Sequence, residues 1–319
     1  MRFGIVTPVL NGEKFLDETI LGVVSQAGPF SIWYHIQDGG SKDATLKLLA
    51  AWRSRLARDF PTFCEGIKFS FASEPDRGLY DAVNRGFTAC GDSDAMAWIN
   101  ADDRFEPGAF ATVEEIFRGF PDIEWLTARP TVIAESGSLM NVSPIIPFPR
   151  QAIAAGIFDG RFARSFIEQE ATFWRPRLWQ KTGGVDPNFR FAGDFDLWRR
   201  FARQTDLVIV DAILGCFRMR AGQLSADMAR YRAEIDASLS PAELETRAKV
   251  AKTYARAGFE YRVMLRHYGG PWVCERWPMC ILPFFGTKAH RPEHWRLSVM
   301  GWFAKKSDDW VVDKPIRYG

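Results

Sequence analysis

The sequence has few of the residues that bind soft metals or build disulfide frameworks. Its 319 residues include 5 Cys and 4 His, scattered along the chain. No two cysteines have C-x-x-C spacing, and an odd number in a chain of this length argues against a disulfide framework. His290 and His294 stand four apart, but Pro292 lies between them and disfavours the helix of a two-histidine zinc site. We predict buried or unreactive thiols and no zinc site.

The chain also lacks an excess of charge of one sign and a long apolar run. Lys and Arg total 41 against 39 Asp and Glu, a net charge of +2, so bulk charge gives no reason to expect a nucleic-acid partner. The apolar stretch at residues 278–285 is far shorter than the roughly 20 residues of a membrane-spanning helix. Residues 1–6 show no apolar signal segment. We therefore expect a cytoplasmic protein.

Three common ligand-binding motifs are missing. There is no G-x-G-x-x-G after the first predicted strand, no G-x-x-x-x-G-K-[ST] and no G-x-S-x-G. These absences argue against a dinucleotide fingerprint, a P-loop and a nucleophile elbow. A nucleotide ligand would have to be held in another way.

The first 130 residues instead alternate strand and helix patterns. Short apolar runs predict strands at residues 3–9, 32–37, 67–72 and 95–99. Amphipathic spacing predicts helices at residues 13–27 and 43–56 and a further one around residues 79–87. This alternation is typical of βαβ units with a parallel sheet.

Polar side chains follow each of these four strands. They are Thr7, Asn11, Asp38, Glu74, Asp76, Arg77, Asp102 and Asp103. In open α/β sheets, ligands bind beyond the carboxyl ends of the strands. Four successive strand ends with polar clusters therefore predict a ligand site at that edge.

Asp102 and Asp103 are adjacent carboxylates whose charges repel unless a cation or solvent compensates them. Mg²⁺ or Mn²⁺, completed by substrate phosphates, would do so, and the alternative is a solvated turn that caps the next helix. Asp38 could accept a hydrogen bond from a base imide or could cap an ordinary turn. Arg77 could bind a base edge or phosphate or form a surface ion pair with Asp76 or Asp81.

The later part of the chain contains one further candidate. Residues 129–165 look like a long excursion or lid, and two strands are predicted at residues 207–210 and 213–218. Asp194 stands at a predicted helix start, where it could act as a general base or merely cap the helix. Ser240 and Pro241 open a helix expected to reach about residue 267.

Seven short motifs together resemble the family 2 inverting glycosyltransferases of GT-A fold. In family order they are TPVLN at 7–11, QDGGSKD at 37–43, EPDRG at 74–78, NADD at 100–103, FWR at 173–175, GGVD at 183–186 and GDFDLW at 193–198. The resemblance covers residues 3 to about 225. It implies a mixed, mainly parallel sheet flanked by helices in a catalytic domain at 1–225. Residues 1–128 would bind the nucleotide, 129–225 would face the acceptor, and 226–319 would form a helical, aromatic extension.

The resemblance also implies roles for individual residues. The donor site would contain Thr7, Pro8, Asn11, Asp38, Arg77, Asn100, Asp102, Arg218 and Arg220. Asp103, with Asp102, would hold Mn²⁺ or Mg²⁺ on the diphosphate, and Asp194 would deprotonate the acceptor hydroxyl, with Asp196 or Glu170 as alternative bases.

Two positions depart from the family pattern. Gly193 stands where a Glu is common, and Arg220 stands near the place of a frequent His. Arg220 cannot bind a cation, but it or Arg218 could neutralise the diphosphate directly.

The expected function is metal-dependent transfer of a sugar, with inversion, from a nucleotide sugar to a hydroxyl acceptor. A UDP-sugar is the favoured donor, and bacterial polysaccharide or glycolipid synthesis is the expected setting. A nucleotidyltransferase is an alternative, but it would be expected to carry a Gly-rich loop with Lys or Arg directly after the first strand, and residues 7–12 have only Gly12 and no basic residue. A non-catalytic nucleotide-sugar-binding protein is the other alternative.

The segment after residue 270 is rich in tryptophan and basic side chains: Trp272, Trp277, Trp295, Trp302 and Trp310, with Arg276, Arg291, Arg296, Lys305 and Lys306. Such a composition fits peripheral contact with the inner face of a membrane, where a lipid-linked acceptor would be reached. The alternative is that these side chains pack on the catalytic domain or form a homodimer interface.

Overall fold

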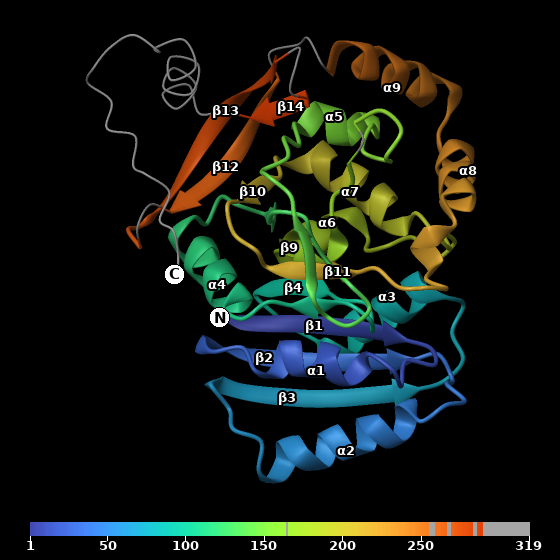
Figure 1. The fold of residues 1–319 in the computed structure, drawn as a ribbon, viewed down its shortest axis with the longest axis vertical. Coiled ribbons are helices and arrows are strands. Elements are labelled where there is room, and N and C mark those ends of the chain that lie inside the picture. Colours follow the sequence, from blue (N-terminus) through green and yellow to red (C-terminus); the bar gives the residue numbers. More distant parts are fainter. Residues whose placement is uncertain (164, 255–258, 267–268, 283–285, 290–319) are drawn as a thin grey trace, which may run out of the picture.

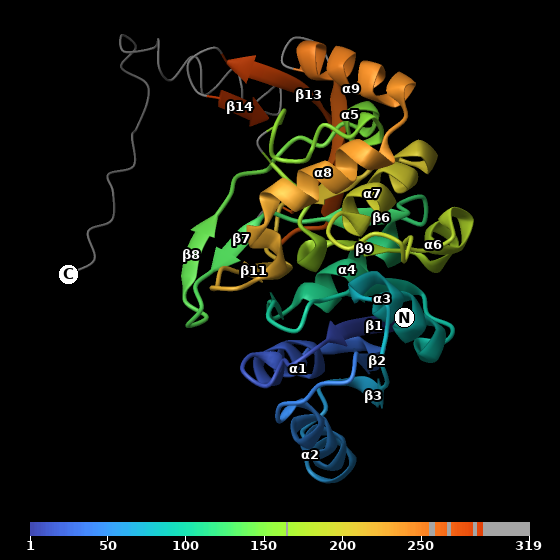
Figure 2. The ribbon, with the colours of Figure 1, turned by 90° about the vertical axis from the view of Figure 1, so that its right-hand side faces the viewer.

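A computed structural model of the chain describes residues 1–163, 165–254, 259–266, 269–282 and 286–289. The backbone forms one large twisted sheet with helices on its faces and a second, smaller sheet beside it (Figure 1). The strand order in the large sheet is β14-β13-β12-β10-β6-β9-β4-β1-β2-β3, and that in the small sheet is β5-β11-β7-β8. Figures 1 and 2 both place α2 at one end of the molecule and α9 at the other. The predicted α/β class with a mainly parallel sheet is confirmed.

The N-terminal part consists of parallel βαβ units, as the sequence predicts. Its elements are β1 (Arg2–Val9), α1 (Leu16–Val24), β2 (Gly28–Asp38), α2 (Thr45–Arg58), β3 (Cys64–Ser73), α3 (Leu79–Cys90) and β4 (Ala95–Trp98). Strand β1 pairs in parallel with both β2 and β4, and β2 pairs in parallel with β3. The carboxyl ends of these strands therefore lie along one edge of the sheet.

The middle of the chain interrupts this parallel order. Its elements are β5 (Arg104–Phe105), α4 (Ala109–Gly119), β6 (Trp125–Thr127), β7 (Thr131–Ile133), β8 (Leu139–Val142), α5 (Arg150–Ala155), η1 (Gln169–Ala171), β9 (Phe173–Trp174), α6 (Pro176–Thr182), α7 (Gly193–Gln204), β10 (Val208–Val210) and β11 (Gly215–Arg218). Strand β9 lies antiparallel between β4 and β6. The expected excursion at 129–165 contains the β7–β8 hairpin and α5.

The C-terminal part is not purely helical, which corrects the sequence prediction. It contains η2 (Leu224–Ala226), α8 (Met228–Ser238), α9 (Pro241–Tyr254), β12 (Glu260–Arg266), β13 (Trp272–Leu282) and β14 (Gly286–Ala289). The helix expected to reach about residue 267 ends at Tyr254, and β12 pairs in parallel with β10. Tyr261, Val263, Met264 and Leu265 of β12 are all buried, so both faces of this strand are covered and its sequence lacks a clean period of two.

Tryptophan is concentrated in the core as well as in the C-terminal segment. Trp98, Trp125, Trp174 and Trp198 are almost fully buried, and the ring of Trp198 lies parallel to that of Trp98 at 5.7 Å. This cluster lies where β4, β6, β9 and α7 meet, directly beneath the edge that carries the predicted site.

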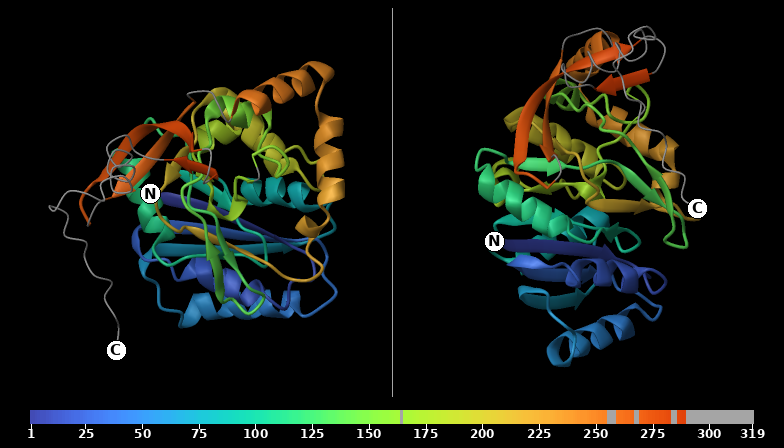
Figure 3. Two further views of the ribbon diagram at one scale, coloured as in Figure 1. Left: turned by 45° about the horizontal axis from the view of Figure 1, so that its top comes forward. Right: turned by 60° about the vertical axis from the view of Figure 1, so that its left-hand side comes forward.

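Two tryptophans of the C-terminal segment pack on the rest of the molecule. The indole N–H of Trp272 donates to Glu115 of α4 at 2.8 Å, and Trp277 is 8% exposed beside Tyr261. Figure 3 shows the β12–β13 pair beside α4. Trp272 and Trp277 therefore agree with the alternative that the tryptophans of this segment pack on the rest of the protein. Trp295, Trp302 and Trp310, with Arg291, Arg296, Lys305 and Lys306, lie outside the described residues. Among the helices of the described residues, none has the length and apolarity needed to cross a bilayer.

Candidate active site

A cavity of about 660 Å³ opens at the carboxyl edge of the sheet. Its wall includes Pro8 at the end of β1, Asn11 in the loop that follows, Asp102 after β4, Asp194 at the start of α7 and Tyr231 of α8. The volume is typical of a small-molecule site. Residues on both sides of the predicted domain boundary at 225 line it, so helix α8 belongs to the same site as the sheet edge.

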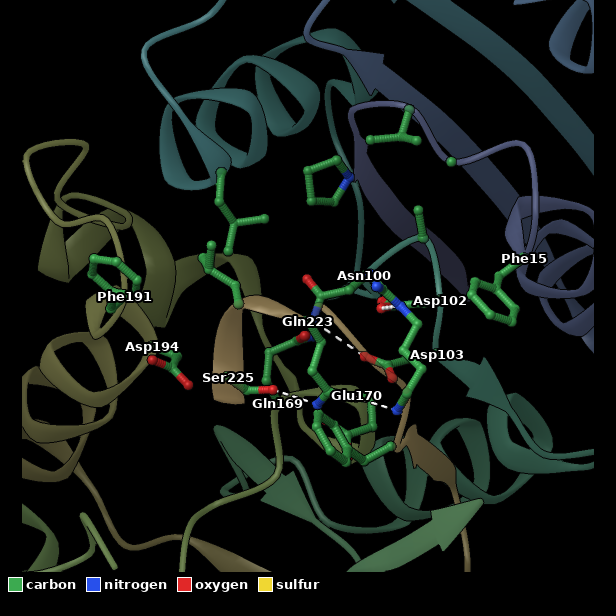
Figure 4. Close-up of a pocket in the computed structure, with 18 of the residues that line it drawn as sticks. Phe15, Asn100, Asp102, Asp103, Gln169, Glu170, Phe191, Asp194, Gln223 and Ser225 are labelled. Atoms are coloured by element: carbon green, nitrogen blue, oxygen red, sulfur yellow. Dashed lines mark hydrogen bonds and ion pairs between the residues drawn. The ribbon is translucent and has the colours of Figure 1, made fainter. Parts of the chain in front are cut away.

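One wall of the cavity carries the adjacent carboxylates Asp102 and Asp103 (Figure 4). Asp103 is 1% exposed, and its Oδ1 accepts the backbone N–H of Arg218 at 2.9 Å while Oδ2 accepts the Asn100 amide at 3.2 Å. Burial, reinforced by the charge of Asp102, raises the pKa of Asp103 well above its usual range. The Nε of Arg220 donates to Asp102 Oδ2 at 2.6 Å.

A second acidic pair, Glu168 and Glu170, lies beside the first and also lines the cavity. Burial raises the pKa of both, and the charge of Glu168 raises that of Glu170 further. Glu170 Oε1 is buried without a hydrogen-bond partner in the described structure. Sequence reasoning named Glu170 only as an alternative base and missed Glu168. The E-x-E spacing at 168–170, just before β9, is a weak signal by itself.

These carboxylates fit a divalent cation that the protein holds with few ligands. Mutual repulsion and burial disfavour their charged forms, and a cation would relieve both. Among the described residues, no three carboxylate, imidazole or thiol side chains converge on one point. Asp102 and Asp103 are the two side chains that would hold the cation, and substrate phosphates would complete its shell, as is common for Mg²⁺.

Asp194 lies on the opposite side of the cavity, in the first turn of α7, close to Phe191 (Figure 4). The hydroxyl of Tyr80 donates to its Oδ1 at 3.3 Å. Burial raises the pKa of Asp194 to about 6. A carboxylate with that pKa is well matched to general-base work near neutral pH. Asp196 instead pairs with Arg200 at 2.8 Å and is not among the residues that line the cavity.

The glycine before Asp194 is explained by the same tyrosine. A Cβ at Gly193 would lie 2.7 Å from the ring of Tyr80, so no larger side chain fits there without a shift. The ring of Tyr80 therefore occupies the space that the side chain of a Glu at position 193 would need.

Asn11 is placed at the cavity by an unusual backbone conformation. Its φ of 53° lies in the left-handed region, which Asn tolerates better than most residues. Its N–H donates to Ser41 Oγ at 2.7 Å and its side-chain oxygen accepts the N–H of Lys42 at 2.8 Å. Asn11 thus joins the ends of β1 and β2 at the rim.

Three predicted nucleotide-pocket residues do not line this cavity. Thr7 is buried and shares a hydrogen bond with the Tyr34 hydroxyl at 2.9 Å. Asp38 accepts from Ser73 Oγ at 2.6 Å and caps its own turn. Arg77 pairs with Asp81 at 3.0 Å, with its side chain 68% exposed. Asp38 and Arg77 therefore make the contacts of a turn cap and a surface ion pair, and their roles toward a base remain predictions.

The two arginines expected at the diphosphate are placed differently, and the expectation fails for Arg218. Arg218 is 1% exposed and lies outside the cavity lining, and its guanidinium donates to Glu18 at 2.6 Å, to the Asp102 carbonyl at 2.6 Å and to the Glu135 carbonyl at 2.9 Å. Its donors are occupied within the protein, which makes it a structural residue. Arg220 lines the cavity and is the better placed cation.

Comparisons with known proteins agree with this geometry. Residues 4–133 match the family described as glycosyl transferase family 2. The chain is 26% identical over 213 residues to an uncharacterized glycosyltransferase of Mycobacterium tuberculosis, covering 66% of this chain and 72% of the relative.

Two solved structures share the fold. S. aureus TarS (residues 1–349, in complex with UDP-GlcNAc) superposes with a TM-score of 0.54 at 13% identity, over 81% of this chain and 74% of the other. The mannosyltransferase PcManGT from Pyrobaculum calidifontis, in complex with GDP-Man and Mn²⁺, gives 0.52 at 13% identity, over 80% and 75%. The resemblance seen in the motifs is therefore confirmed: residues 4–133 match glycosyl transferase family 2, and the chain has the GT-A fold.

Proposed function

We propose that this chain transfers a sugar from a nucleoside diphosphate sugar, with a UDP-sugar as the first choice, to a hydroxyl acceptor with inversion at the anomeric carbon. The observation that carries the proposal is that one cavity holds the acidic pair Asp102 and Asp103 on one wall and Asp194 on the other. A single displacement requires groups that bind the diphosphate and a general base that takes the acceptor proton, on opposite sides of one cavity.

Relatives of the same fold support the donor class. One neighbour was solved with UDP-GlcNAc and another with GDP-Man and Mn²⁺. Both ligands are nucleoside diphosphate sugars, so the class is better supported than the base. The resemblance of the motifs favours UDP.

In the proposed reaction the acceptor oxygen attacks the anomeric carbon and forms the new glycosidic bond. The bond from that carbon to the diphosphate oxygen breaks, and the nucleoside diphosphate leaves with the electron pair. Asp194 Oδ takes the acceptor proton, for which its pKa of about 6 is suited. Attack opposite the leaving group inverts the anomeric configuration.

The opposite wall would stabilise the leaving group. Arg220 supplies a guanidinium at the rim and would exchange part of its contact with Asp102 for the diphosphate. Mn²⁺ or Mg²⁺ held by Asp102 and Asp103 would supply further positive charge to the diphosphate oxygens.

Near Asp194 the cavity has an apolar, aromatic wall: Phe191 lies close to this carboxylate, and Phe166 and Tyr231 line a small hollow together with it. Such a wall fits the face of a sugar ring or an apolar aglycone near Asp194. This supports an acceptor from polysaccharide or glycolipid synthesis. Peripheral membrane contact or a homodimer through the C-terminal segment remains part of the proposal, and flotation with anionic liposomes alongside sedimentation tests both.

The direct test of the donor site is a thermal-shift panel of nucleotide sugars with and without Mn²⁺, since a ligand that binds the folded state raises apparent stability. We expect a Mn²⁺-dependent shift with a UDP-sugar that is lost in Asp103→Asn. An Mn²⁺-dependent shift of the same size in Asp103→Asn would contradict the metal assignment. Release of pyrophosphate would instead indicate a nucleotidyltransferase, and binding without turnover would indicate a non-catalytic binding protein.

A further inference from the structure

Helix α8 places a carboxylate against the loop that leads to Asp194. Glu234 Oε1 accepts the backbone N–H of Arg190 at 2.7 Å, and Oε2 accepts those of Phe191 and Ala192 at 2.8 Å each. Three consecutive backbone donors thus converge on one side chain. Helix α7 begins at the next residue, so the N–H of its N-cap residue Ala192 is one of the helix donors that lack an intrahelical partner. Glu234 therefore binds this donor and the two backbone N–H groups of the loop directly before α7.

The contact is supported by packing on both sides. Ile235 and Leu239 of α8 form a buried cluster with Ala192 and Phe195 at the start of α7. Two residues after Glu234, Asp236 receives both terminal nitrogens of the Arg161 guanidinium, at 2.6 and 2.7 Å. These contacts fix α8, so Glu234 is presented to the loop by a rigid element.

The same loop is also held from the side of the sheet. The hydroxyl of Tyr80 donates to the Phe191 carbonyl at 3.0 Å and also lies 3.3 Å from Asp194 Oδ1. The backbone of Phe191 is therefore bound on its N–H side by Glu234 and on its carbonyl side by Tyr80. The peptide that joins Phe191 to Ala192 is thus hydrogen-bonded at both its carbonyl and its N–H. This restricts the position of Asp194, which follows two residues later.

We propose that Glu234 is the positioning residue for the catalytic base, supplied by a segment of the chain that lies beyond the residues matching the family. It acts by binding the three amides of residues 190–192 and thereby sets the direction in which Asp194 faces the acceptor. This inference rests on the proposed function, in which Asp194 is the base.

Glu234 also influences the charge state of Asp194. The ionisable groups that act on Asp194 are Tyr80 from α3 and Tyr231 and Glu234 from α8. Burial is the main cause of the raised pKa of Asp194, and the negative charge of Glu234 adds to it. Removal of that charge should lower the pH at which the base loses activity.

The test compares Glu234→Ala and Glu234→Gln with the matched control Glu243→Gln. Glu243 is another carboxylate of the C-terminal part that bridges to α7, through Arg199 at 2.8 Å and Arg203 at 2.7 Å, but away from the loop. The measurements are hydrogen exchange of amides 190–192, kcat and donor KM, and the acidic limb of the pH profile.

In Glu234→Ala we expect amides 190–192 to exchange at least ~10-fold faster. We also expect kcat to fall roughly tenfold or more with donor KM within about twofold. Glu234→Gln should recover part of kcat, because its oxygen still accepts hydrogen bonds, while its acidic limb moves to lower pH. Glu243→Gln should leave amide exchange at 190–192 and the acidic limb unchanged.

The proposal is overturned if Glu234→Ala retains amide protection and kcat, or if Glu243→Gln produces the same changes. Exchange at 190–192, and the ionisation of Asp194 followed by NMR, are read without turnover. If the wild-type chain transferred no sugar from any nucleotide tested, the proposed function would fail, and these two readouts would still decide whether Glu234 holds the loop.

Discussion

Asp194 combines a position at the cavity wall with a pKa that burial raises to about 6. Since only the ionised carboxylate can take a proton, kcat/KM should fall about tenfold per pH unit below pH 6. A pH–rate profile at subsaturating donor measures this limb. The control Asp196→Asn, at a residue outside the cavity lining, should show the same fall in kcat/KM below pH 6. A wild-type kcat/KM that stays constant down to pH 5 would exclude Asp194 as the base.

The same pKa makes a prediction about stability. Because the folded-state pKa of Asp194 lies above the unfolded value of 3.8, ionisation costs folding free energy as pH rises from about 4 through 6. Asp194→Asn should therefore be more stable than the wild type at pH 7.5, by no more than about 3 kcal/mol, and this difference should shrink toward pH 4. Urea unfolding at the two pH values measures it. A variant less stable than the wild type at pH 7.5 would show that the ionised form is not destabilised by burial.

At the scale of elements, α8 lines the cavity although it and α9 follow the predicted catalytic domain. A buried ion-pair cluster anchors them: Asp159 is fully buried and binds Arg161 at 2.6 Å, and it also pairs with Arg247 of α9. Arg247 is 2% exposed. These helices are therefore fixed to the segment that follows α5.

This anchoring can be tested by Asp159→Asn. The substitution leaves a buried guanidinium short of its counter-charge, and we expect a loss of about 3 kcal/mol in the free energy of unfolding. The control Glu245→Gln breaks a pair with Lys249 in which both side chains are more than two-thirds exposed, and it should change stability by less than about 0.5 kcal/mol. Denaturant titration measures the free energy of unfolding of the wild type and the two variants. Equal values for all three would contradict the anchoring role of Asp159.

Sequence periodicity predicted some elements better than others for a physical reason. Strands β1 and β4 are buried on both faces, so each appears as a short apolar run bounded by polar loop residues. Strand β12 was missed because the capping signal at Ser240 and Pro241 starts a helix but does not say where that helix ends. The segment from Tyr261 to Leu265 is buried on both faces and therefore carries no clean period of two that would have marked a strand.

At the scale of the whole molecule, the rule that ligands bind beyond the carboxyl ends of the strands predicted part of the cavity wall but not all of it. Asn100, Asp102 and Asp103 follow β4 and do line the cavity. Glu168 and Tyr231 come from an irregular segment and from α8, and their positions depend on tertiary packing that no local pattern encodes. Arg218 illustrates the opposite case, because its charge predicts a ligand contact while its burial makes it structural.

The central claim is that the two walls of one cavity perform separate tasks, donor binding at Asp102 and Asp103 and proton removal at Asp194. The most direct measurement is the transfer rate of Asp194→Asn at saturating donor, after its donor Kd has been shown to equal that of the wild type. We expect Asp194→Asn to transfer sugar at least ~100-fold more slowly than the wild type, with unchanged donor affinity. A rate within about threefold of the wild type would contradict it.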